Sequence, residues 1–240
     1  MAGHGHLPSG SACLRLLNDG VCPPAVNMAR DVALFDSFER GECPPTLRVY
    51  QWASPALTYG VNQELPTRLV AACEQHNIPM FRRPTGGKAV LHGHDLTLAL
   101  VWQPAPTRLY PRQVYLQVAP ALIRAFEALG APARQGDAAA PDPRSIDDGG
   151  DCFATPAIAD IVCAETGVKL MGCALLVRGV RVLMQASIPL HLPDVPVEQL
   201  FGHPHPPPPP LDANSLIQTL YTTLNAHLQG TISRYKTQRQ

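Results

Sequence analysis

The chain has 240 residues and a mass of 25.9 kDa, and 45% of its residues are hydrophobic and 16% charged. This composition is typical of a globular protein and excludes a disordered or coiled-coil chain. The 19 basic residues balance the 19 acidic ones, so no overall basic field draws the chain to nucleic acid or to an anionic membrane. We therefore expect neither of these as a partner.

Length and cysteine usage indicate one domain in a reducing compartment. A chain of this length forms one sizeable domain with at most a small appendage. The seven cysteines include no Cys-x-x-Cys pair, which favours a reduced, cytoplasmic protein over a disulfide framework. The N-terminus does not resemble a signal peptide, and no run of ~18 apolar residues predicts a membrane span. We expect a flexible tail over 1–12 and a single domain over 13–240.

Hydrophobic periodicity predicts mixed secondary structure through the first half of the chain. Apolar residues at helical spacing predict helices over 24–38, 66–77 and 114–129, with Pro120 as a potential kink or break in the third. Alternating and β-branched patterns predict strands over 46–52, 55–61 and 95–102, together with a strand, a glycine turn and a strand over 81–92.

The second half begins with a long segment without periodicity. Residues 131–151 are rich in alanine, proline, aspartate and glycine, and such a long loop inside a domain is either disordered or functional. An antiparallel meander follows, with strands over 158–163, 168–176 and 180–189. Residues 203–210 predict a stiff proline-rich spacer, interpreted as a surface loop or else as a docking motif for a proline-binding module. An amphipathic helix over 216–228 ends the pattern.

The densest chemical motif is the run Arg82-Arg83-Pro84-Thr85-Gly86-Gly87-Lys88-Ala89-Val90-Leu91-His92. Glycines allow backbone amides to approach a ligand closely, while the basic side chains beside them attract anionic groups. The motif is not a P-loop, because that spacing is absent and no helix begins there. It predicts a site for a phosphate or an acyl carrier, or, as the structural alternative, a tight hairpin flanked by surface arginines.

Cys152 and Lys169 are the other two candidates for chemistry. Cys152 lies where the long loop meets a strand, a position where catalytic residues often gather, and a thiolate is a strong nucleophile when a base or cation activates it. Cys163 and Cys173 lie within predicted strands and are interpreted as small buried hydrophobes. Lys169 is one of only three lysines, and either its compact, tunable charge is needed there or it is retained by chance.

Three His-x-His pairs begin at His4, His92 and His203. Residues two apart on a strand share a face, so His92 and His94 are candidate metal ligands. No carboxylate or thiolate at suitable spacing completes that set, and we therefore predict no metal site.

Together these segments resemble the catalytic domain of the lipoate-protein ligase and octanoyltransferase family, whose signature is R-R-x-T-G-G-[GRK]-A-V-x-H. Upstream, Asn27-Met28-Ala29 and Asp31 resemble the family's N-M-A-x-D helix. Residues 52–63 resemble its W-x-x-P-x-x-S-x-G-x-x-Q motif. Downstream, residues 167–174 resemble its G-x-K-[IL]-x-G-S-A motif, so the similarity spans about residues 14–190.

The resemblance implies an α/β (α+β) fold, with a mixed, largely antiparallel sheet and flanking helices, shared with biotin-protein ligases. Lys169 takes the position of the family's lysine that contacts the acyl carbonyl. The basic Lys88 after Gly-Gly, and a Cys-Phe segment before Lys169, resemble the cysteine-dependent octanoyltransferases, which makes Cys152 the expected acyl nucleophile. The expected substrate-binding residues are Arg83, Thr85, Gly86, Gly87, Lys88, His92 and Gly172.

The implied reaction moves an octanoyl or lipoyl group from an acyl carrier protein thioester, through an acyl-enzyme on Cys152, to a lysine of a lipoyl domain. That acceptor belongs to a 2-oxoacid dehydrogenase or is the glycine cleavage H protein, and no cofactor is required. In this mechanism the ammonium of Lys169 depresses the pKa of the thiol, polarises the carbonyl and relays protons.

Two alternatives stay open. One is a lipoate or octanoate ligase that uses ATP and Mg²⁺, and the other is a non-catalytic module that binds a lipoyl domain. The sequence departs from the family pattern at Leu175, where glutamine is frequent, and at Ala186, where glycine is usual. The interval between Cys152 and Lys169 is also slightly longer than usual.

Overall fold

Two β-sheets form the frame of the computed structural model, which describes residues 13–104, 110–136 and 150–237. The larger sheet has the strand order β1-β2-β6-β10-β9-β8-β7, and the smaller has the order β4-β3-β5. The larger sheet comprises β1 (Arg15–Cys22), β2 (Thr46–Trp52), β6 (Asp95–Trp102), β7 (Ala133–Gln135), β8 (Ile161–Cys163), β9 (Lys169–Arg178) and β10 (Arg181–Pro189). The smaller comprises β3 (Ala56–Tyr59), β4 (Met80–Arg82) and β5 (Val90–His92).

Strand direction in the larger sheet confirms the expected mixed, largely antiparallel arrangement. Only β1 and β2 run parallel, and every other neighbouring pair is antiparallel. The β8-β9-β10 meander agrees with the predicted strands. Antiparallel neighbours joined by tight turns need only local sequence signals, which is why the pattern located them.

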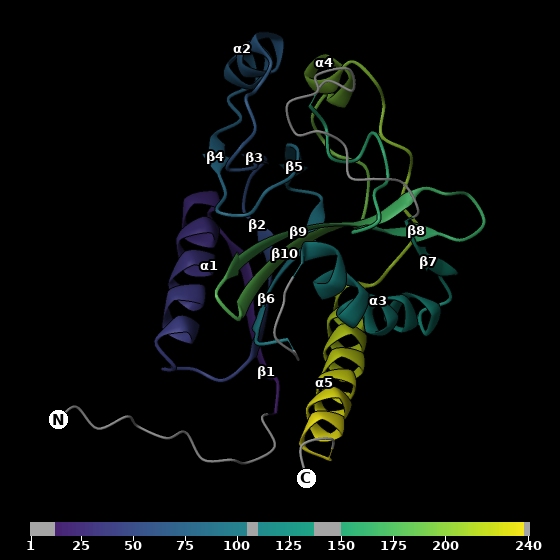
Figure 1. Cartoon of the computed structure of the whole chain (residues 1–240). Coiled ribbons are helices and arrows are strands. Elements are labelled where there is room, and N and C mark those ends of the chain that lie inside the picture. Colours follow the sequence, from purple (N-terminus) through teal and green to yellow (C-terminus); the bar gives the residue numbers. More distant parts are fainter. Residues whose placement is uncertain (1–12, 105–109, 137–149, 238–240) are drawn as a thin grey trace, which may run out of the picture.

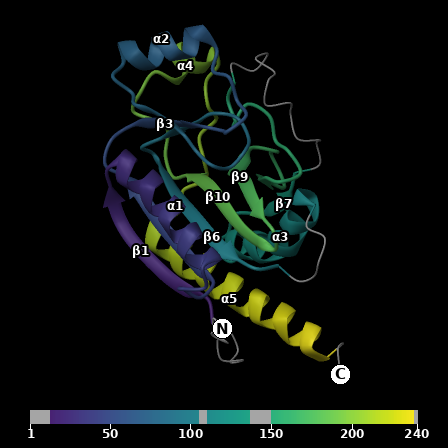
Figure 2. The ribbon, with the colours of Figure 1, turned by 60° about the vertical axis from the view of Figure 1, so that its left-hand side comes forward.

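Helices cover both faces of the larger sheet, as Figures 1 and 2 show. The helices on this sheet are α1 (Pro24–Glu39), α3 (Pro111–Glu127) and α5 (Ala213–Thr237), whereas α2 (Thr67–Gln75) and α4 (Val197–Phe201) pack against the smaller sheet. The central strand β6 is buried along its whole length. Its successive side chains point alternately to the two faces of the sheet. Leu96, Leu98 and Leu100 pack with α3 and α5, whereas Ala99 and Val101 pack with α1.

The smaller sheet lies with α2 and α4 at one end of the larger sheet (Figure 1). It has its own apolar cluster, in which Leu57 and Leu91 of the sheet contact Leu69 of α2 and Leu200 of α4. The space between this cluster and the end of the larger sheet contains the candidate site.

Several elements differ from the sequence prediction. The strands β1 and β7 and the short helix α4 were not predicted, and β7 occupies the start of the segment interpreted as a loop over 131–151. Pro120 lies within α3 without dividing it. The tail over 1–12 and residues 137–149 lie outside the described residues, and the single domain over 13–240 stays a prediction.

The interpretation of 81–92 as a possible hairpin is wrong. The strands β4 and β5 do not pair with each other, because β3 lies between them, parallel to β4 and antiparallel to β5. The glycine turn therefore crosses from one edge of the smaller sheet to the other. No helix among the described residues is long and apolar enough to cross a membrane.

Candidate active site

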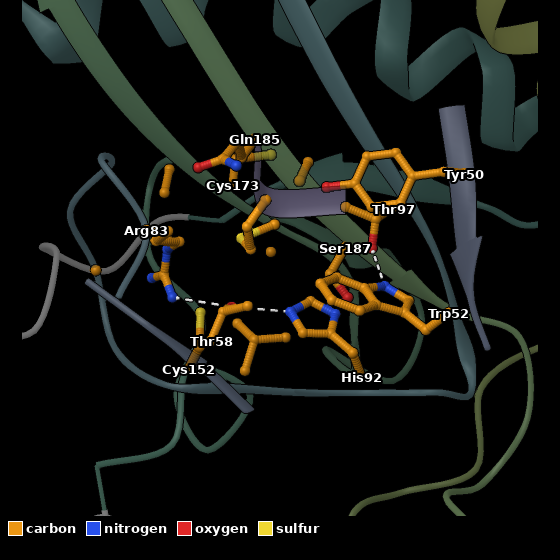
Figure 3. Close-up of a pocket in the computed structure, with 16 residues that line it drawn as sticks. Tyr50, Trp52, Thr58, Arg83, His92, Thr97, Cys152, Cys173, Gln185 and Ser187 are labelled. Atoms are coloured by element: carbon orange, nitrogen blue, oxygen red, sulfur yellow. Dashed lines mark hydrogen bonds between the residues drawn. The ribbon is translucent and has the colours of Figure 1, made fainter. Parts of the chain in front are cut away.

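A pocket of about 420 Å³, open to solvent, lies between the two sheets, within the usual size range of small-molecule sites. Figure 3 shows Arg83 and Cys152 on one side of it and Trp52 and Tyr50 on the other. Its lining residues are Met28, Tyr50, Trp52, Thr58, Arg83, Gly87, Val90, His92, Thr97, Cys152, Gly172, Cys173, Ala174, Gln185, Ala186 and Ser187.

Backbone pairing with the glycine turn holds Cys152 at this pocket. The N–H of Cys152 donates to the carbonyl of Ala89 (2.8 Å), and the N–H of Ala89 donates to the carbonyl of Gly150 (2.9 Å). Asp151 and Ala89 form an isolated parallel bridge. Beneath the sulfur lies Gly172, where a Cβ atom would come within 3.4 Å of the sulfur of Cys152. Ala89 of the glycine motif thus docks the segment that carries Cys152, and Gly172 of the downstream motif leaves space for its sulfur.

Lys169 approaches Cys152 from the start of β9. Its Nζ lies 3.9 Å from the Sγ of Cys152 and also donates a hydrogen bond to the carbonyl of Cys152. On its other side, Nζ forms an ion pair with Asp160 Oδ2 at 2.7 Å, and both side chains are at most 4% exposed. Asp160 was not singled out in the sequence, because only the tertiary fold brings it to the lysine.

The electrostatics differ from the expected activation. Burial raises the pKa of the Cys152 thiol, and the opposing effects of Lys169 and Arg83 do not offset it. Burial also opposes the charge of Lys169, but the neighbouring Cys152 and Asp160 outweigh burial and raise the pKa of the lysine. Lys169 therefore keeps a positive charge beside the sulfur of Cys152.

Arg83 is a second buried cation at the pocket. It is 5% exposed, and its guanidinium donates to the carbonyls of Gly86 and Lys88, each at 2.7 Å, and to the hydroxyl of Thr85 at 3.1 Å. Burial lowers its pKa to about 10, so it stays charged at neutral pH. Within the described part of the chain no carboxylate pairs with it, and its positive charge acts on the pocket. The expectation of a surface arginine at this position is wrong.

The glycine turn passes so close to β3 that no side chain fits between them. A Cβ atom on Gly60 would lie 2.2 Å from the carbonyl oxygen of Gly87, and Gly87 itself has a φ of 86°. Glycine is the residue that accepts both a close backbone approach and a left-handed conformation. The two glycines fix the path of the turn that carries Arg83.

A buried carboxylate, Asp95, organises one side of the pocket floor. Its Oδ2 accepts hydrogen bonds from Ser187 (2.6 Å) and Thr97 (2.8 Å) and lies 2.8 Å from Nδ1 of His92. Nε2 of His92 lies 2.8 Å from the hydroxyl of Thr58. Burial opposes the charge of Asp95, but His92 and the hydroxyl donors outweigh it and hold the pKa of Asp95 well below its usual range.

A second buried carboxylate, Asp31 of α1, organises the other side. Its Oδ1 lies 2.6 Å from Arg48, and its Oδ2 accepts hydrogen bonds from Tyr50 (2.7 Å) and Gln185 (2.6 Å). Gln185 in turn accepts a hydrogen bond from Thr85 at 2.8 Å. This network links the N-M-A-x-D helix to the glycine motif, which explains why both patterns occur together.

The predicted binding residues divide into three groups. Arg83, Gly87, His92 and Gly172 line the pocket together with Cys152. Thr85, Gly86 and Lys88 lie behind it: the first bonds Gln185, and the other two supply carbonyls to Arg83. Lys169 lines an adjoining cavity with Phe153, His94, His191 and His205. Asp95, Asp160 and Gln185 are contributors that sequence reasoning missed, and Asp31 was noted only as part of the helix motif.

The histidine pairs are arranged differently from the prediction. Both ring nitrogens of His92 are engaged, by Asp95 and Thr58, so the pair with His94 does not form a metal site. His203 and His205 instead lie 2.9 Å and 2.7 Å from the carboxylate of Asp151. The start of the proline-rich spacer therefore contacts the site region, while its residues stay exposed or half-buried, as expected of a surface loop.

Comparison with known proteins agrees with this geometry. Residues 23–231 match the lipoyl protein ligase A/B catalytic domain. The octanoyltransferase LipM of Oceanobacillus iheyensis is 34% identical over 180 residues, which cover 74% of this chain and 63% of that protein. The octanoyltransferase LipM of Geobacillus kaustophilus is 31% identical over 203 residues, which cover 80% of this chain and 70% of that protein. The chain thus spans slightly under two thirds of the first of these relatives.

A solved structure has the same fold. It is a T. acidophilum protein described as a lipoate protein ligase and solved with bound lipoic acid, which superposes with a TM-score of 0.69 at 22% sequence identity. The superposition covers 89% of this chain and 85% of that one. At this identity the likeness extends to the fold, and the chemistry has to be argued from the residues of the site.

Proposed function

The chain belongs to the lipoyl protein ligase A/B catalytic domain family, and we propose that it is an acyltransferase that moves an octanoyl group to a lipoyl domain through Cys152. The observation that carries this proposal is the 3.9 Å approach of Lys169 Nζ to the sulfur of Cys152 at the wall of the pocket. Relatives at 31–34% identity that are named octanoyltransferase support the same reaction.

In the first step the sulfur of Cys152 attacks the thioester carbonyl of an octanoylated acyl carrier protein. A new sulfur–carbon bond forms, the bond to the carrier sulfur breaks, and the thiol proton of Cys152 leaves with the carrier thiolate. Negative charge gathers on the attacking sulfur and then on the carbonyl oxygen. The fixed charges of Lys169 and Arg83 stabilise it, as cations do in a site shielded from water.

In the second step a lysine amine of a lipoyl domain attacks the acyl-enzyme. The amide bond forms, the bond between the acyl carbon and Cys152 breaks, and the sulfur recovers a proton from the amine. Exchange between two thioesters is nearly isoenergetic and amide formation runs downhill, so the protein has only to position groups and stabilise charge. ATP, Mg²⁺ and other cofactors have no part in this scheme.

The pocket suits the acyl chain. Met28, Trp52, Val90 and Ala174 contribute apolar surface to it, and an alkyl chain gains free energy when such surface removes it from water. Cys152 lines the same pocket as these side chains, so an acyl chain bound among them has its carbonyl end near the sulfur. We expect the polar floor around Asp95 to limit how deep the chain extends, since burying alkyl groups against charge is unfavourable.

The deciding experiment is incubation of the chain with octanoylated acyl carrier protein without ATP, followed by intact-mass measurement. We expect one octanoyl adduct that hydroxylamine removes and that a lipoyl domain discharges as an amide. The adduct should vanish in Cys152→Ala and persist in Cys173→Ala, which removes the other cysteine at the pocket. An adduct in Cys152→Ala, or transfer only from free octanoate with ATP and Mg²⁺, would overturn the proposal in favour of another nucleophile or a ligase.

A further inference from the structure

A cluster of metal-binding side chains lies immediately before the nucleophile, and we propose that Asp151, His203 and His205 bind a zinc ion. Oδ2 of Asp151 is 2.9 Å from Nε2 of His203 and 2.7 Å from Nε2 of His205. The three ligand atoms all lie within 4.8 Å of one another. The site is separate from the acyl pocket, because none of the three residues lines it.

The proline-rich spacer holds the imidazole rings of His203 and His205 in position before a metal ion binds. His203 and His205 are separated by Pro204 and followed by Pro206, and proline fixes one backbone dihedral and reduces the conformational freedom lost on binding. Phe201, at the end of α4, stacks on both rings, with centroid separations of 6.2 Å and 5.8 Å. The rings are therefore held side by side and facing the same carboxylate.

Asp151 is equally well fixed. It is fully buried, and its Oδ1 accepts a hydrogen bond from the N–H of Phe153 at 2.9 Å. The backbone bridge to Ala89 restrains its main chain. With one oxygen engaged by the backbone, the other is directed at the histidines. Such outer contacts orient metal ligands and make their carboxylates better donors.

The donor set favours zinc. Two imidazole nitrogens and one carboxylate oxygen are the ligands of many zinc sites that keep a fourth position for water, whereas Mg²⁺ and Ca²⁺ prefer oxygen ligands alone. Ligand atoms around tetrahedral zinc are roughly 3.3 Å apart, so the rings move outward by about half an ångström from their present hydrogen bonds. The ion takes the place of the two Nε2 hydrogens, with each ring in its Nδ1–H tautomer.

Zinc at this position ties together parts of the chain that flank the chemistry. Asp151 precedes Cys152, and His205 lines the cavity that Lys169 also lines. The ion therefore fixes the proline-rich segment against the loop segment that carries the nucleophile. The alternative is a metal-free clamp, in which both histidines donate hydrogen bonds to the carboxylate of Asp151. The two arrangements are distinguished by whether the three residues bind zinc.

The test is calorimetric titration of the chelator-treated full chain with ZnCl₂, repeated with CoCl₂ while visible absorption is recorded. We expect one equivalent to bind and the cobalt form to show the intense bands of a tetrahedral site. His205→Ala and Asp151→Asn should each weaken zinc binding by more than about tenfold, the lower bound for outer-contact losses. His191→Ala, which removes an exposed histidine beside the same cavity, should bind as the unmodified chain does.

His203→Ala keeps the test decisive if a buried substitution impairs folding. The His203 side chain is 31% exposed, so we expect this variant to fold and to unfold cooperatively in chelator, while its zinc affinity falls by at least about tenfold. Absence of zinc binding by the unmodified chain, or equal affinity in His203→Ala, would overturn the proposal and leave the hydrogen-bonded clamp. Neither readout depends on acyl transfer.

Discussion

Asp160 Oδ2 lies 2.7 Å from Lys169 Nζ, the same ammonium that contacts the carbonyl and the sulfur of Cys152. The other oxygen of Asp160 accepts the N–H of Cys173 at 3.2 Å, so the carboxylate is anchored to the same strand that begins with the lysine. The pair therefore has two consequences that are separable by experiment: it keeps the ammonium charged and in place, and it compensates a buried carboxylate.

We predict that Lys169→Met abolishes most acylation and also destabilises the protein. Removing one member of a buried ion pair leaves the other uncompensated, which costs about 3–5 kcal/mol, while loss of a charged transition-state contact slows the reaction by roughly 100- to 1,000-fold. The double variant Lys169→Met with Asp160→Asn should recover most of the stability and none of the rate. Urea unfolding and single-turnover acylation measure the two quantities.

The matched control for this cycle is Glu165→Gln, which removes an exposed carboxylate from the turn preceding the same strand. It should change neither the unfolding free energy nor the acylation rate. If the double variant acylates as fast as the unmodified chain, Lys169 has a structural role only and the charge argument fails.

The second prediction concerns the close approach of the glycine turn to β3. Gly60→Ala places a Cβ 2.2 Å from the carbonyl oxygen of Gly87, which forces two backbone segments apart and should cost about 3 kcal/mol. Gly86→Ala is the matched comparison, because a Cβ there meets nothing within 4 Å. Thermal unfolding should separate the two variants clearly. Equal melting temperatures would mean that the turn moves freely and does not position Arg83.

Local sequence patterns were sufficient to locate the helices and strands whose buried residues recur at a regular spacing. The α1 helix, with Leu34, Phe35 and Phe38 on its buried face, and the strand β6, fully buried, were both located. The strand β1 was missed because as an edge strand it is largely exposed and has no alternation of apolar residues. The strand β7 has only three residues and owes its pairing to β8.

Residue types and motifs pointed to Cys152 and Lys169, which the fold brings together, but not to the residues that support them. Cys152 and Lys169 were identified because a thiol and a scarce lysine are unusual within their local patterns. Asp160, Asp95 and the histidines of the spacer were not, because an acid or a His-x-His pair looks the same on a solvated surface and in a buried network. Their roles depend on contacts between residues far apart in the chain, which no local pattern records.

The third prediction is a loss of stability in mild acid that His94 causes. Burial lowers the pKa of His94 to about 4, and Nδ1 of its ring has no hydrogen-bond partner among the described residues. Because its folded pKa lies below the unfolded value of about 6.5, the stabilising effect of the neutral ring is fully present above pH 6.5 and is lost as the pH falls towards 4. Between pH 7 and pH 5 this amounts to about 2 kcal/mol.

Urea unfolding in the presence of chelator, at pH 7 and at pH 5, checks this prediction. The quantity compared is the change in unfolding free energy between the two pH values. His94→Leu removes the titrating group while keeping the site apolar, so its stability should fall by about 2 kcal/mol less than that of the unmodified chain over the same interval. Parallel pH profiles for the unmodified chain and His94→Leu would contradict the assignment.

The last prediction tests whether the pocket between the sheets holds the acyl chain. Ala174 lines it from β9, and it pairs in register with Gln185, another lining residue. Ala174→Leu adds three carbons to this wall, which should lower the specificity constant for octanoyl transfer by about tenfold or more, because displaced methylene groups lose their apolar contacts. A butanoyl donor, which needs less of the pocket, should be affected much less. Competition between the two donors, followed by intact mass of the acyl-enzyme, measures the ratio of the specificity constants for octanoyl and butanoyl transfer.

The matched control is Ala128→Leu, on the surface after α3. It adds the same bulk away from the pocket and should leave this ratio unchanged. An unchanged ratio in Ala174→Leu would mean that the acyl chain lies elsewhere, with the adjoining cavity beside Lys169 as the next place to look.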